Sequence, residues 1–142
     1  MPPDAKTLEV KLWLTKASSD IAAGLHGLTA IPPFTVEALF HAQKAAEKAL
    51  KGFLIWHEVT FRKVHDIRLL GEEVTKLDPT LTPCILLASD LTPYAVMFRY
   101  PGEASEPSLS EAQDALQLAG TVISEILKRL PPDTHPKDRT RA

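Results

Sequence analysis

The chain has one cysteine, Cys84, among its 142 residues. A single cysteine excludes an internal disulfide and any metal site built from several cysteines. Because Cys84 lies among apolar residues, we expect it to be a small buried hydrophobe. No apolar run approaches the roughly 20 residues that a membrane-spanning helix needs, and the first residues show no signal-peptide pattern. These absences favour a cytoplasmic protein without a membrane segment.

An excess of one charge and the common site motifs are also missing. The formal net charge is −2, so the overall charge predicts no attraction to nucleic acid or to a membrane, and any basic site must be local. The sequence contains no metal-ligand spacing, no Gly-rich phosphate loop and no Gly-x-Ser-x-Gly motif. We therefore expect no bound metal and no cofactor.

The composition that remains is typical of one globular domain, with 44% hydrophobic and 24% charged residues. Apolar residues recur with a helical period in five segments, and no segment alternates as a strand does. We predict an all-α, up-and-down bundle of about five helices over residues 7–130, with disorder in residues 1–6 and 131–142. The predicted helices are 7–28, 35–57, 66–77, 83–99 and 109–130.

Helix ends carry recognisable signals. Thr35 and Asp66 are predicted to cap the second and third helices, and Ser108 with Glu111 forms a capping box at the last one. Pro93 falls inside the fourth predicted helix, where it should kink the helix or split it in two.

The second predicted helix should be the central element, because a helical projection gives it three different faces. One face is wide and apolar, with Gln43 in its middle and Glu47 at its edge. A second face is lined with the small residues Ala42, Ala45, Ala49 and Gly52 and ends in Trp56. The third face is basic: His41, Lys44, Lys48 and Lys51. A helix of this kind packs on two sides and still reaches solvent.

The polar residues on this helix each have two interpretations. Clustered cations attract phosphate, but they also form ordinary solvated helix surfaces. A buried Gln43 must find hydrogen bonds, either with the backbone or with a polar partner such as Asp20 or Arg99. Asp20 lies at the border of the apolar arc of the first helix, so it needs a cationic or hydrogen-bonding partner.

Two further segments carry candidate residues. Arg99, before Tyr100 and Pro101, either pairs with a buried carboxylate or presents its guanidinium to a phosphate. His65 precedes the capping Asp66, and a general acid or base role for His65 would need a second group nearby. We assign a structural role to four polar residues: Asp20, Gln43, Glu47 and Asp66.

Four features together resemble the HEPN family (higher eukaryote and prokaryote nucleotide-binding domains). They are residues 41–51 (HAQKAAEKALK), the His-Asp pair 65–66, residues 99–102 (RYPG) and an Ala-rich last helix. The positions that match the family pattern are Gln43, Glu47, Lys48, Arg99, Tyr100 and Pro101. The resemblance spans about residues 7–130 and implies an all-α homodimer, often paired with a small nucleotidyltransferase in a toxin–antitoxin-like system. We expect the small-residue face, or the polar region around it, to serve that association.

The resemblance also implies a sequence motif by which ribonuclease activity can be judged. Many HEPN proteins are metal-independent ribonucleases whose motif is an Arg followed four to six residues later by His. Arg99 has no His at that spacing, Arg62 lies too close to His65, and Arg68 has none within reach. We therefore predict that the motif is absent.

The leading hypothesis is a dimeric HEPN protein that works with a nucleotidyltransferase and contacts a nucleotide or RNA. The residues expected to contact phosphate are His41, Lys44, Lys48, Lys51, Arg99 and Tyr100. One alternative is a ribonuclease toxin that uses a displaced His41 or His65 near Arg99. Another is a helical adaptor that binds proteins without any nucleotide contact.

Overall fold

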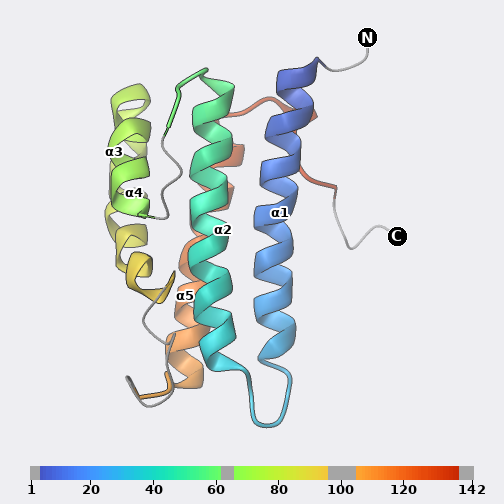
Figure 1. The fold of residues 1–142 in the computed structure, drawn as a ribbon, viewed down its shortest axis with the longest axis vertical. Coiled ribbons are helices and arrows are strands. Elements are labelled where there is room, and N and C mark those ends of the chain that lie inside the picture. The colour runs from blue at the N-terminus through green and yellow to red at the C-terminus, as the bar shows by residue number, and fades with distance from the viewer. Residues whose placement is uncertain (1–3, 62–65, 96–104, 138–142) are drawn as a thin grey trace.

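The computed structural model describes residues 4–61, 66–95 and 105–137, and in these ranges it contains five α-helices and no strand (Figure 1). The helices are α1 (Ala5–Gly27), α2 (Thr35–Trp56), α3 (Ile67–Leu77), α4 (Thr82–Ala88) and α5 (Leu109–Leu127). Three short 3-10 segments are η1 (Pro79–Leu81), η2 (Ser89–Ala95) and η3 (Pro132–Thr134). The all-α prediction is confirmed. None of the helices in these ranges has both the length and the apolar content to cross a membrane.

Helix α2 is the central element, as predicted. It packs against α1, α3, α5 and η2, and Figure 1 shows it between α1 on one side and α3 with α4 on the other. Its small residues let α1 approach closely: a Cβ added to Gly52 would lie 3.4 Å from the Cβ of Trp13. Ala42, Ala45 and Ala49 are fully buried. The small-residue face is therefore used inside the chain, and association between chains through the polar region around it stays a prediction.

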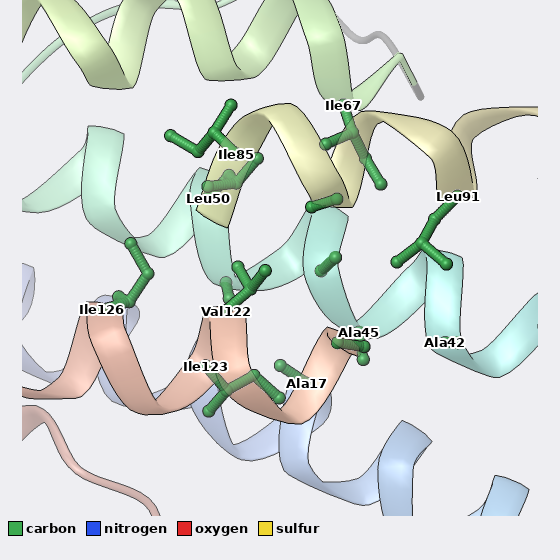
Figure 2. Packing of buried hydrophobic residues seen from close by; sticks show 14 of the residues in the cluster. Ala17, Ala42, Ala45, Leu50, Ile67, Ile85, Leu91, Val122, Ile123 and Ile126 are labelled. Atoms are coloured by element: carbon green, nitrogen blue, oxygen red, sulfur yellow. The ribbon is translucent and has the colours of Figure 1, made fainter. Parts of the chain in front are cut away.

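The apolar faces of all five helices meet in one core. Figure 2 shows Leu50 of α2, Ile85 of α4 and Val122 with Ile126 of α5 turned toward one another. Leu50 is fully buried, and truncating such a leucine to alanine typically removes about 2–5 kcal/mol of stability. The core, more than helix propensity, holds the bundle together.

Most helix starts follow the sequence signals. The Asp66 carboxylate accepts the Arg68 N–H at 2.9 Å, and the Ser108 hydroxyl accepts the Glu111 N–H at 3.0 Å. Thr35, however, is the first residue of α2 and not its cap, since the cap position is Phe34 and makes no side-chain hydrogen bond.

The two ends of the described chain are more ordered than predicted. Asp4 caps α1 by accepting the Thr7 N–H at 2.8 Å, so residues 4–6 belong to the helix start and not to a disordered segment. At the other end, Thr134 in η3 is buried and η3 packs against α1. The prediction of a disordered tail is therefore wrong for residues 131–137.

The fourth predicted helix is divided, and the position of the break has a simple cause. Helix α4 ends at Ala88 and continues as the 3-10 segment η2, which contains Pro93. In an α-helix the proline ring would clash with the carbonyl four residues earlier, which here belongs to Ser89. The backbone changes from α-helix to 3-10 helix at that residue. The rest of the predicted helix, residues 96–99, lies outside the described ranges.

Two glycines provide a matched test of the packing. A Cβ on Gly71 would overlap Cγ2 of Ile85 across the α3–α4 contact, whereas a Cβ on Gly120 of α5 would meet nothing within 4 Å. We expect Gly71→Ala to lower the free energy of unfolding by about 1–3 kcal/mol through overpacking. Gly120→Ala should raise it by about 0.5–1 kcal/mol, because alanine is the better helix former.

Urea unfolding followed by far-ultraviolet circular dichroism measures both changes. A Gly71→Ala variant as stable as the parent chain would contradict the close α3–α4 contact.

Candidate functional site

Asp20 of α1 is bound by two side chains of α2. The His41 Nδ1–H donates to Oδ1 of Asp20 at 2.8 Å, and Lys48 Nζ donates to Oδ2 at 2.6 Å. His41 and Lys48 are seven residues apart, so they lie on one helix face two turns from each other. The Asp20 side chain is only 12% exposed. These are the cationic and hydrogen-bonding partners that a carboxylate in this position requires.

A second carboxylate lies further into the same face. Glu47 receives Lys44 Nζ at 3.4 Å on Oε2 and Lys51 Nζ at 3.2 Å on Oε1. The Glu47 side chain is 3% exposed and that of Lys51 is 10% exposed. Lys51 Nζ also lies 5.7 Å from the centre of the Trp13 ring. Burial therefore separates Lys51 from the solvent-facing part of this face.

We call the polar arc of α2 the set formed by five residues of α2 and the α1 carboxylate that two of them bind: His41, Lys44, Glu47, Lys48, Lys51 and Asp20. The predicted basic face is thus a network in which two carboxylates offset three ammonium groups. Its solvent-facing members are His41, Lys44 and Lys48, all half-buried. This arrangement leaves a small local excess of positive charge at the surface, although the whole chain is acidic.

The polar arc also fixes the chemistry of one histidine. Because an ionised carboxylate only accepts, the hydrogen bond to Asp20 places a proton on Nδ1 of His41. In the neutral ring, Nε2 is then the nitrogen that accepts a proton or a hydrogen bond. A proton on Nε2 would make the ring a donor toward a phosphate oxygen, beside the ammonium groups of Lys44 and Lys48. Within the described ranges, no group of three or more metal-binding side chains was found.

The remaining candidates fall into two sets. Gln43 is fully buried in α2, and Asp66 caps α3; both are placed where a structural role is expected. Arg99, Tyr100 and His65 lie outside the described ranges, so their contacts with phosphate or with a carboxylate stay predictions. The alternative of a displaced histidine beside Arg99 is untested for the same reason.

Cys84 differs from its prediction. It is half-buried instead of buried, and its Sγ donates to the Leu81 carbonyl oxygen at 3.3 Å. Burial raises the pKa of the thiol above its ordinary value, which keeps it in the unreactive protonated form at neutral pH.

The prediction that no arginine precedes a histidine at the ribonuclease spacing is wrong. Arg129 precedes His135 by six positions. The signal was present in the sequence, but it crosses from the last predicted helix into residues assigned to a disordered tail. In the structure, His135 Nε2–H donates to the carbonyl oxygens of Leu127 and Leu130, at 2.9 and 3.1 Å. The imidazole therefore closes the end of α5.

Arg129 likewise has structural partners. Its Nε donates to Oδ2 of Asp78 at 2.8 Å, its Nη1 to Oε2 of Glu125 at 3.0 Å, and its Nη2 to Oγ1 of Thr80 at 2.8 Å. The guanidinium thus ties the end of α5 to the start of η1. A catalytic arginine would need donors directed at a substrate, and here the guanidinium donates to three side chains and to the Glu125 carbonyl oxygen of the same chain.

The chain matches a known protein family. A family model described as the HEPN domain matches residues 10–130. Neither the curated proteins nor the solved structures give a match.

The Arg129 contact generates a prediction about acid stability. Hydrogen bonds from Thr80, first its hydroxyl and then its N–H, lower the pKa of Asp78; burial opposes them, and Arg129 adds to the lowering. A carboxyl whose pKa is depressed by folding stabilises the fold above its unfolded pKa of about 3.9, and this contribution disappears as the pH falls through the folded pKa. We expect Asp78→Asn to melt below the parent chain at pH 7 and the difference to shrink below about pH 4.

Melting curves followed by circular dichroism between pH 7 and pH 3 measure this difference. The control is Asp114→Asn, at an exposed carboxyl that pairs with no residue in the described ranges. A difference for Asp78→Asn that is unchanged across the series would show that the charge of Asp78 does not stabilise the fold.

Proposed function

The chain belongs to the HEPN family, and from this premise we propose that it acts as a homodimer that binds a nucleotide or RNA phosphate at the polar arc of α2. We further propose that it works in the cytoplasm with a small nucleotidyltransferase, as a toxin–antitoxin-like pair. The dimer and the partner are supported by the family resemblance. Phosphate binding is supported by the side chains of the arc.

The observation that carries the proposal is the shared carboxylate of Asp20. It holds His41 and Lys48 at 2.8 and 2.6 Å, so both side chains are positioned before any ligand arrives. Positioned donors lose less side-chain entropy on binding than mobile ones. Lys44 follows His41 by one helical turn, which brings a second ammonium group beside the ring. A phosphate at this surface meets the two ammonium donors on one face of α2, and meets the Nε2–H of His41 as a third donor when the ring is protonated.

The test is binding of ATP, GTP and a short single-stranded RNA, by calorimetry and by fluorescence anisotropy. We expect saturable binding that weakens on the order of tenfold in Lys44→Ala/Lys48→Ala, since charge-assisted hydrogen bonds to phosphate are lost. Lys76→Ala is the matched control, because Lys76 is exposed and pairs only locally with Glu73. Light scattering of the same samples should give twice the chain mass.

Binding that is absent, or equal in the double variant and the parent chain, would reject phosphate binding at the arc. That result would favour the adaptor alternative. A monomer at micromolar concentration would reject the dimer separately.

Ribonuclease activity is the second candidate, favoured by the spacing of Arg129 and His135. Both side chains are bound within the chain, so we expect RNA incubated with the protein without metal to stay intact. Gel analysis of the RNA from the binding assay decides the point. Cleavage that is lost in His135→Ala, with the variant still folded, would establish the ribonuclease instead.

A further inference from the structure

The outer surface of α1 combines exposed leucines with shallow hollows. Helix α1 lies at the edge of the bundle in Figure 1, and Leu8 and Leu12, one turn apart, are 49% and 62% exposed. A hollow of about 410 Å³ lies toward α2, where Trp13 lines it with Leu12. A second, of about 370 Å³, lies toward the C-terminal segment and shares Leu12 with the first. Leu12 is thus a ridge between two hollows.

Lysines surround these hollows. Lys16 and Lys48 line the first hollow and Lys11 and Lys137 line the second, while Glu9 is the one acidic residue in either lining. Asp20 holds Lys48. Within the described ranges, no carboxylate lies within ion-pair distance of the other three lysines. An apolar ridge with a basic border is therefore present on a chain whose net charge is −2.

We propose that this surface of α1 docks an acidic amphipathic helix of a partner protein. Such a helix presents apolar side chains at i, i+4 and i+7, with carboxylates along both sides. Its apolar side chains would enter the two hollows over Leu12, and its carboxylates would meet Lys11, Lys16 and Lys137. The distance along α1 from Leu8 to Lys16 is about 12 Å at 1.5 Å per residue, so two to three turns of the partner cover the surface.

Other occupants fit the surface less well. A second copy placed with the same face across a two-fold axis would bring lysines against lysines, and like charges facing each other are unfavourable. RNA would use the lysines, but its phosphates offer nothing to the leucines or to the apolar lining. The surface adjoins the polar arc at Lys48. Leu8, Leu12 and the other lysines nevertheless lie outside the arc, so docking of a partner helix does not depend on phosphate binding there.

The experiment uses the full chain and a labelled synthetic peptide of about 18 residues, with leucines at i, i+4 and i+7 and glutamates beside them. We expect saturable fluorescence anisotropy that weakens on the order of tenfold or more in Lys11→Glu/Lys16→Glu, because two attractions become repulsions. Leu12→Ala should weaken binding several-fold. Neither of these variants touches the polar arc, so they separate this proposal from phosphate binding.

The matched controls are Lys76→Glu on α3, and Leu25→Ala, which changes another leucine of α1 that is 52% exposed. Both should bind the peptide as the parent chain does, and circular dichroism establishes that every variant is folded. Three outcomes would overturn the proposal. The peptide fails to saturate, a scrambled peptide of equal composition binds equally, or oligouridine RNA, and not the peptide, loses affinity in Lys11→Glu/Lys16→Glu.

Discussion

The close approach of α1 to α2 is the constraint on which the rest of the structure depends. It requires a small side chain where the two helices meet, and Gly52 supplies one against Trp13 and Leu14; Ala42, Ala45 and Ala49 on the same face of α2 are fully buried. At this spacing a carboxylate on α1 reaches an imidazole and an ammonium group on α2 directly. Larger residues on that face would separate the helices and leave Asp20 half-buried without its partners, which is unfavourable for an ionised carboxylate. The packing of the core and the geometry of the polar arc therefore have one cause.

The polar arc shows how a helix carries several cations without becoming a basic surface. Asp20 binds His41 and Lys48, and Glu47 binds Lys44 and Lys51. The side chains of Glu47 and Lys51 are almost fully removed from solvent. A charge count along the sequence sees His41, Lys44, Lys48 and Lys51 as equivalent. In the structure, Lys51 is buried and pairs with Glu47, while Asp20 fixes His41 and Lys48 at the surface. The candidate site is defined by which carboxylate each cation meets.

The sequence was sufficient to predict what local rules decide. Helical periodicity located all five helices, and the capping signals at Asp66 and Ser108 were correct because a cap depends on neighbours within one turn. It was not sufficient where distant segments decide. The pairing of Asp20 with His41 needs two helices in register, and the order at Thr134 needs contact with α1. Arg129 binds Asp78, some fifty residues earlier in the chain. The spacing from Arg129 to His135 alone would therefore have suggested ribonuclease activity, whereas in the structure both side chains hold parts of the fold together.

The imidazole of His135 has a practical consequence for where the domain is taken to end. The family match stops at residue 130, yet the ring that satisfies the last carbonyl groups of α5 comes from five residues further on. A protein shortened to the matched boundary would expose those carbonyls to water and uncover the part of α1 against which η3 packs. The folding unit is longer than the region that the family model matches, because η3 packs against α1 beyond residue 130.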